Sequence, residues 1–306
     1  MINRIETIYY SPTGTSEKVA ETVAGAFAKS LANKLASMEP AEDYYVTQAV
    51  TDITLKAKYA EFDNTFAIIA APVYGGRIAP TAVERLRKIK AKNSYCAVIA
   101  LYGNRDYEDA LLELMNEARN CGFLTLAAGA FIGEHSYSTD KYPIAQDRPD
   151  NDDIEKCCNF GEELADHYSG LLEKCGRREA IADAFWQNLE LPLVKGNYPY
   201  KEYRPSPATP QTNTSVCVLC GRCIDMCPVS CIEMKSAAEL TDADKLADGS
   251  NIDGEIIVSD PEICTKCCAC VKGCPFGARI YNTPYSEKLN RNCSVRKEPE
   301  WYFGEK

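Results

Sequence analysis

The sequence predicts two domains of different classes, a doubly wound α/β domain followed by a small cysteine-rich α+β domain. Three observations lead to this prediction. Apolar segments alternate with segments of helical periodicity through residues 1–175, a proline-rich stretch follows, and a cysteine motif then occurs twice. A chain of 306 residues is long enough for two domains. We expect a helix and linker over residues 176–212, the cysteine-rich domain over 213–283 and a tail over 284–306.

Four apolar segments of the first domain are expected to be buried parallel strands. They are rich in Ile, Val and Ala and too continuous for a strand with one exposed face. A weaker candidate strand covers residues 44–50. The four segments are residues 7–10, 65–73, 96–102 and 124–132. Five strands that alternate with helices imply a parallel sheet covered on both faces, in the order 2-1-3-4-5.

Helices are expected between these strands, because apolar residues recur there at helical spacing, as in Val19, Val23 and Phe27. Gly122 follows the third of them, where it would serve as a helix C-cap. The expected helices cover residues 16–35, 80–90, 107–121 and 152–175. A further helix is expected over residues 177–190.

Residues 191–215 are expected to form an extended linker. Five prolines in this stretch cannot continue a helix or a central strand. Tyr198, Tyr200 and Tyr203 would keep the linker packed on a surface rather than free.

The 16 cysteines are distributed unevenly, with five in residues 1–175 and eleven in residues 217–293. The N-terminus lacks a secretory leader, so we expect a cytoplasmic protein, in which disulfides are improbable. The pattern C-x2-C-x2-C-x3-C-P occurs twice, beginning at Cys217 and at Cys264, which marks an internal repeat. Dense, regularly spaced cysteines of this kind indicate metal binding.

Thiolates are soft donors for iron in sulfide clusters, and this spacing resembles that of bacterial ferredoxins with two [4Fe–4S] clusters. The fourth cysteine of each copy lies too far along to reach the cluster of its own triad and would bind the other one. By this resemblance one cluster takes Cys217, Cys220, Cys223 and Cys274, and the other takes Cys264, Cys267, Cys270 and Cys227. Structural zinc is the alternative, which two triads with trailing Cys-Pro fit poorly. Three cysteines have no assigned role: Cys231, Cys268 and Cys293.

Residues 11–16, Ser-Pro-Thr-Gly-Thr-Ser, directly follow the first strand and open the first helix. Hydroxyls, a glycine turn and unpaired helix N-terminal amides make an anion cradle. The segment is neither a P-loop nor a dinucleotide fingerprint, because both glycine patterns are missing from the sequence here. An ordinary helix N-cap turn is the alternative.

Two more loops end in the same region, because the carboxyl ends of strands one, three and four converge at the switch point of such a sheet. Each supplies a tyrosine and glycines, in PVYGGR (residues 72–77) and YGNRDYEDA (residues 102–110). The arrangement resembles the flavodoxin family over roughly residues 3–170. The resemblance implies that FMN phosphate binds Ser11, Thr13, Gly14, Thr15 and Ser16. It implies ring contacts from Pro72, Val73, Tyr74, Gly75, Tyr102, Gly103, Asn104 and Tyr107, with simple surface packing of each tyrosine as the alternative.

Charged and titratable residues near these loops leave alternatives open. Arg77 and Arg105 would face either the flavin or solvent. His135 would donate a hydrogen bond to the flavin or a proton to a substrate, or be only a hydrogen-bonded loop histidine. His167, on a polar helix, is expected to be solvated.

The whole chain resembles flavodoxin–ferredoxin fusion proteins of anaerobes, which implies FMN and two [4Fe–4S] clusters as cofactors. We expect an electron-transfer protein that couples one-electron clusters to FMN and exchanges electrons with partner redox proteins. The alternatives are an FMN-dependent reductase of a quinone, nitro or enone compound and, beyond that, a redox sensor with structural clusters. A net charge of −10, of which −8 lies in residues 1–175, argues against nucleic acid or anionic membrane as a partner. No stretch of 18 apolar residues occurs, so no transmembrane helix is expected.

Overall fold

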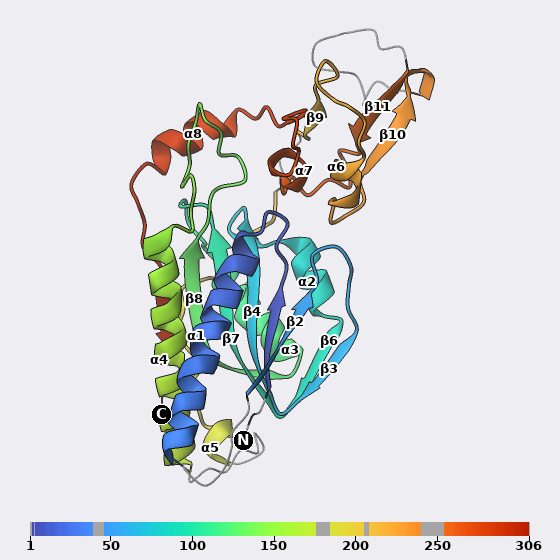
Figure 1. The fold of residues 1–306 in the computed structure, drawn as a ribbon. Coiled ribbons are helices and arrows are strands. Elements are labelled where there is room, and N and C mark those ends of the chain that lie inside the picture. Colours follow the sequence, from blue (N-terminus) through green and yellow to red (C-terminus); the bar gives the residue numbers. More distant parts are fainter. Residues whose placement is uncertain are drawn as a thin grey trace.

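The computed structural model describes residue 2 and residues 4–38, 46–175, 184–204, 208–239 and 254–305. Its centre is a parallel sheet in which the strands lie in the order β2-β1-β4-β7-β8 (Figure 1). These strands are β1 (Arg4–Tyr9), β2 (Thr47–Asp52), β4 (Thr65–Tyr74), β7 (Ser94–Tyr102) and β8 (Phe123–Ile132). Every residue of β7 is buried, which explains its continuous apolar sequence. The doubly wound α/β class is confirmed.

Helices cover both faces of this sheet. One face carries α1 (Thr15–Met38) and α4 (Asn151–Lys174), which lie side by side in Figure 1 and share one hydrophobic core with the sheet. The other face carries α2 (Pro80–Leu86) and α3 (Ala110–Asn120), in a second core. Gly122 follows Cys121, the C-cap residue of α3, and its φ of 101° is typical of the glycine that ends a helix.

The first domain also contains short strands that the sequence did not predict. The expected helix over residues 80–90 ends early, because β6 (Ile89–Lys92) pairs in parallel with β3 (Ala60–Asp63). A two-residue strand, β5 (Arg77–Ile78), turns back on the end of β4.

The expected tail is a structural part of the first domain. Helix α8 (Tyr285–Asn292) crosses above the carboxyl edge of the sheet, and β13 (Glu300–Phe303) pairs antiparallel with β8 (Figure 1). With β5 and β13 the sheet has seven strands, so the expectation of five was wrong in number. The pairing of β13 with β8 covers the edge of β8, and the ring of Trp301 packs against those of Phe131 and Phe160, at centroid distances of 6.1 and 5.7 Å.

The cysteine-rich domain sits above the carboxyl ends of the parallel strands (Figure 1). Its two ribbons are antiparallel pairs, β10 with β11 and β9 with β12. The elements are β9 (Gln211–Thr212), α6 (Arg222–Asp225), β10 (Ile232–Ser236), the 3-10 helix η1 (Ala237–Glu239), β11 (Glu255–Ser259), α7 (Ala269–Lys272) and β12 (Arg279–Ile280). Most of the polar stretch between the two motif copies, residues 236–252, lies outside the described residues.

The linker packs on the first domain as expected. The helix expected over residues 177–190 is described only from residue 184 on, where it contains α5 (Ala184–Gln187). The Asp109 carboxylate accepts hydrogen bonds from the backbone amides of Asn197 and Lys201, at 2.9 and 2.8 Å. The ring of Tyr200 lies under the Arg77 guanidinium, 4.7 Å from the ring centroid. None of the helices in the described ranges is both long and apolar enough to cross a membrane.

Candidate functional site

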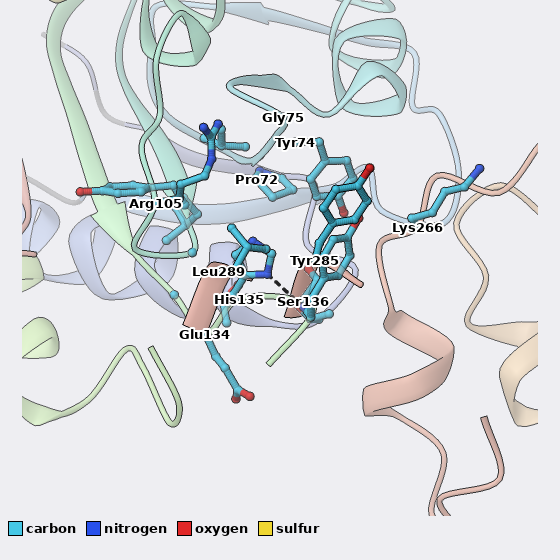
Figure 2. Close-up of a pocket in the computed structure, with 18 of the residues that line it drawn as sticks. Pro72, Tyr74, Gly75, Arg105, Glu134, His135, Ser136, Lys266, Tyr285 and Leu289 are labelled. Carbon is cyan, nitrogen blue, oxygen red and sulfur yellow. Dashed lines mark hydrogen bonds between the residues drawn. The ribbon is translucent and has the colours of Figure 1, made fainter. Parts of the chain in front are cut away.

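A cavity of about 930 Å³ lies where the carboxyl ends of β1, β4, β7 and β8 meet. Figure 2 shows Pro72, Tyr74 and Gly75 on one side and Glu134, His135 and Ser136 on another. Ten of the predicted flavin-site residues line it: Ser11, Thr13, Thr15, Ser16, Pro72, Val73, Tyr74, Gly75, Tyr102 and Gly103. The volume is in the range of cavities that bind cofactors.

The loop after β1 has the geometry of an anion cradle. Gly14 has a φ of 83°, which lets the chain turn into α1. The hydroxyl of Ser11 accepts a 3.0 Å hydrogen bond from the amide of Glu17 and so caps the helix. Because α1 begins at Thr15, the amides of its first turn lack helical acceptors and lie beside the cavity. The residues present fit a phosphate group.

The loops after β4 and β7 supply walls for a planar ligand. Tyr74 and Tyr102 both line the cavity, and burial raises the pKa of each phenol well above its usual value. Both rings are therefore neutral contact surfaces at physiological pH. Gly103 lets the ring of His135 pack against the backbone, because a Cβ at residue 103 would lie 2.4 Å from Cδ2 of His135.

Two predicted ring contacts lie elsewhere. Asn104 is buried, and its amide donates hydrogen bonds to the carbonyls of Cys293 and Val295, at 2.6 and 2.9 Å. Tyr107 packs behind Tyr102, with ring centroids 5.5 Å apart. Neither side chain lines the cavity. Asn104 instead holds the segment that follows α8.

His135 lies in the loop after β8, on the cavity wall (Figure 2). Its Nδ1 accepts a 3.0 Å hydrogen bond from the amide of Tyr137. Burial, together with the charges of Arg105 and Lys272, lowers the pKa of His135 to about 4. The ring is therefore neutral, with its proton on Nε2.

The other titratable candidates, Arg77, Arg105 and His167, lie in different surroundings. Arg105 lines the cavity, whereas Arg77 is held by the Glu113 carboxylate at 2.5 Å and by the Lys201 carbonyl at 2.6 Å. The expectation of a solvated His167 was wrong. Its ring lies 4.9 Å from that of Phe303, and its buried Nε2 has no partner among the described residues.

Three further walls of the cavity were not predicted from the sequence. They come from the linker, the cysteine-rich domain and α8, and include Tyr203, Thr265, Lys266, Tyr285, Leu289 and Cys293. Figure 2 shows Lys266, Tyr285 and Leu289 among the residues that line the cavity. The tyrosines of the linker were the one sequence signal, since they indicated packing on a surface. The cavity is thus built from both domains.

The eight predicted ligand cysteines fall into two separate cavities. One is lined by Cys217, Cys220, Cys223 and Cys274, and the other by Cys227, Cys264, Cys267 and Cys270. We call these the first and the second cluster cavity. The fourth cysteine of each motif copy therefore lies with the triad of the other copy. Over the described residues, no three His, Cys, Asp or Glu side chains converge as the ligands of a single metal ion do.

Backbone amides point at the sulfurs of both cavities. Sγ of Cys227, Cys264 and Cys274 accepts hydrogen bonds of 3.3–3.4 Å from the amides of Cys231, Lys266 and Ala278. Such N–H···S bonds stabilise thiolates, the form in which cysteine binds iron. The donor set and its hydrogen bonds fit [4Fe–4S] clusters.

The three unassigned cysteines are all buried. Cys231 and Cys268 line the second cluster cavity, and Cys231 Sγ lies 3.5 Å from Cys227 Sγ. Cys293 lies on the wall of the large cavity.

The second cluster cavity adjoins the large cavity. Thr265 lines both. Near this place the two domains are in contact, because Arg85, on α2 of the first domain, donates a hydrogen bond to the carbonyl of Pro228, next to Cys227. The first cluster cavity is lined only by residues of the cysteine-rich domain.

Residues 216–278 match the protein family described as the 4Fe-4S dicluster domain. No curated protein matches the chain. Solved structures are similar to its first domain at low identity. A flavodoxin from the domain Archaea is 12% identical, with a TM-score of 0.32 over 54% of this chain and 99% of the flavodoxin. A flavodoxin of Streptococcus pneumonia is 16% identical, with a TM-score of 0.34 over 53% and 98%.

Rubredoxin oxygen:oxidoreductase from the anaerobe Desulfovibrio gigas is 15% identical, with a TM-score of 0.36 over 55% of this chain. This chain spans only 36% of that oxidoreductase. At these TM-scores, the class of the first domain rests on its own strand order and cavity loops.

The fold and the cysteine motif together define the class, an α/β domain of flavodoxin-like topology joined to a ferredoxin-type iron–sulfur domain. The chain has the architecture of a flavodoxin–ferredoxin fusion, in which the last strand returns to the flavodoxin-like sheet.

Proposed function

We propose that this protein transfers electrons between two [4Fe–4S] clusters and an FMN bound in the large cavity. The observation that carries the proposal is the position of Thr265, on the wall of both the large cavity and the second cluster cavity. Electron transfer needs its centres close together, and among the described residues Thr265 alone lines both cavities. FMN would supply a store for two electrons, and the clusters would pass single electrons.

The chain's own residues would hold and orient these groups. The amides that open α1, with Thr13, Thr15 and Ser16, would bind the FMN phosphate. Tyr74 and Tyr102 would flank the ring, and Nε2 of His135 would donate a hydrogen bond within the cavity. Helix α8 and the linker would exclude water from that side.

The order of the two clusters follows from the same geometry. The second cluster cavity adjoins the flavin cavity, so its cluster would exchange electrons with FMN. The first cluster cavity reaches the surface at Cys220, and its lining includes the exposed side chains of Val218 (56%) and Phe276 (50%). A partner redox protein would dock there, on an apolar surface, in the cytoplasm of an anaerobe.

One observation favours a second function, reduction of a small acceptor at the flavin. The cavity is walled on the side away from the sheet by Tyr203, Lys266 and Leu289, so a flavin there would face a pocket and not open solvent. His135, with its fixed proton on Nε2, lies where an acceptor such as a quinone, nitro or enone compound would enter. A redox sensor with structural clusters is the remaining alternative.

The test is anaerobic purification with iron, sulfide and flavin analysis, followed by turnover assays. We expect eight iron atoms and one FMN per chain, as two [4Fe–4S] clusters require. Turnover of a panel of acceptors with a reduced one-electron donor distinguishes the two functions. A reductase must reduce at least one acceptor faster than free FMN does, whereas a carrier reduces only partner proteins. Purified protein without flavin would contradict both and favour the sensor.

A further inference from the structure

The core of the cysteine-rich domain contains a buried arginine. Arg279, on β12, is only 3% exposed. Its Nη1 donates to the Thr212 hydroxyl at 2.5 Å and to the Ile257 carbonyl at 3.4 Å. Its Nη2 donates to the Pro210 carbonyl at 3.0 Å and to the hydroxyl of Ser259. Every one of these acceptors is a neutral oxygen.

The charge of Arg279 is therefore not compensated within the described chain. No carboxylate among the described residues pairs with it, and its fifth N–H, on Nε, is buried with no partner there. A guanidinium keeps its charge in proteins. A buried cation is strongly disfavoured unless an anion lies nearby. The structure thus calls for a negative group next to Nε.

Two such groups would be adjacent. Arg279 lines the first cluster cavity together with Cys223 and Cys274. Its guanidinium also lies within hydrogen-bonding reach of the Cys270 thiol, a predicted ligand in the second cluster cavity. The arginine therefore lies between the two ligand sets.

From this placement we infer that Arg279 is the buried counter-charge of both iron–sulfur clusters and raises their reduction potentials. The inference rests on the proposed presence of two clusters. A cubane held by four thiolates is an anion and gains one further negative charge when it accepts an electron. A fixed positive charge in a low-dielectric core stabilises the reduced form more than the oxidised form. Arg279 would thus make both clusters easier to reduce.

The test compares Arg279→Gln, which removes the charge, with Arg279→Lys, which keeps it. Arg222→Gln is the matched control, because Arg222 lines the same cavity but is exposed, so solvent screens its charge. Midpoint potentials of both clusters are measured by EPR-monitored titration of the purified full chain, with iron content measured alongside. At a fixed potential, we expect the ratio of reduced to oxidised cluster to fall at least about tenfold in Arg279→Gln, a shift of about 59 mV for one electron. Arg279→Lys and Arg222→Gln should change it less than about threefold, which is under half that shift.

Midpoint potentials of both clusters in Arg279→Gln that equal those of the wild type would overturn the inference. Arg279 would then serve only to connect β9, β11 and β12 through its hydrogen bonds. Arg279→Met, whose own side chain brings no polar group into the core, is the second neutral variant in case Arg279→Gln loses iron. Loss of iron from both neutral variants, with full iron in Arg279→Lys, supports the counter-charge. Loss from all three overturns it. A wild-type protein without iron would instead refute the proposed function itself.

Discussion

The amide of Tyr137 donates a 3.0 Å hydrogen bond to Nδ1 of His135, which lies two residues earlier (Figure 2). This bond leaves Nε2 as the protonated nitrogen of a neutral ring. The wall of the cavity therefore carries a hydrogen-bond donor with a fixed direction, and its protonation state does not change near neutral pH.

The first prediction concerns pH. With a pKa of about 4, His135 should stay neutral down to about pH 5. A histidine in the unfolded chain has a pKa of about 6.5, so the unfolded state binds a proton between pH 6.5 and 4 that the folded state does not. The free energy of unfolding should therefore fall as the pH falls through this range, by up to about 3 kcal/mol from this residue.

NMR of protein with ¹⁵N-labelled histidine measures this directly, because the chain has only two histidines. His167→Gln assigns the remaining signal to His135. We expect the Nε2-protonated tautomer at pH 6. A His135 signal that titrates near pH 6.5 would refute the assignment.

The second prediction concerns the phosphate loop. Gly14→Ala places a side chain at a φ of 83°, which costs about 1–2 kcal/mol of backbone strain although no atom lies within 4 Å of the new Cβ. The free loop would relieve this strain by leaving the cradle conformation, which FMN binding would have to restore, so FMN affinity should fall by up to about tenfold. Gly25→Ala is the control, since Gly25 lies within α1 with equally open space and no positive φ. Fluorescence titration with FMN measures both, and equal affinities would argue against the loop.

The third prediction tests which cysteines share a cluster. Cys274→Ser should remove the cluster of the first cluster cavity and about half of the iron, because Cys274 lies with Cys217. The double variant with Cys217→Ser should lose no more. The double variant with Cys264→Ser should lose both clusters, since Cys264 lines the other cavity. Iron and sulfide analysis distinguishes the cases, and the reverse pattern would mean that each motif copy binds its own cluster.

The fourth prediction concerns the contact between the domains. Arg85→Gln removes the cationic donor to the Pro228 carbonyl and should weaken docking by about 1.5–3 kcal/mol. Electron exchange between clusters and flavin should slow, with iron and FMN contents unchanged. Arg87→Gln is the control, because Arg87 follows the same helix but pairs with Glu117 of the first domain, at 2.6 Å. Pulse radiolysis measures the exchange rate; equal rates in the two variants would contradict the prediction.

Those parts of the fold that depend on local pattern were predictable from the sequence. Buried parallel strands such as β7 are continuous apolar runs, and Gly122 marks a helix end. The spacing of Cys217 and the other motif cysteines likewise predicts which of them lie together in each cluster cavity. By contrast, β13 has four residues and gains its stability from pairing with β8, so its sequence alone shows no strand period.

The cavity was predictable only on the side built by the sheet. Strand ends of a doubly wound fold converge by topology, and Tyr74 and Tyr102 accordingly line the same cavity. Thr265 and Leu289 reach the cavity because segments distant in sequence pack together. The hydrophobic periodicity of a sequence does not show such contacts. Asn104 follows the end of a strand, where a ligand-contacting residue would also lie, but its amide donates hydrogen bonds to the backbone after α8. The sequence does not distinguish these two roles.

The pairing of β13 with β8 has a consequence for how the protein is made. The edge of the first sheet is completed by residues 300–303, which a ribosome adds only after the whole cysteine-rich domain. The flavodoxin-like half therefore emerges first, and one edge of its sheet stays open until residues 300–303 have been made. Cluster insertion and closure of the flavin cavity would then be late, linked steps of maturation, and both domains would reach their final form together.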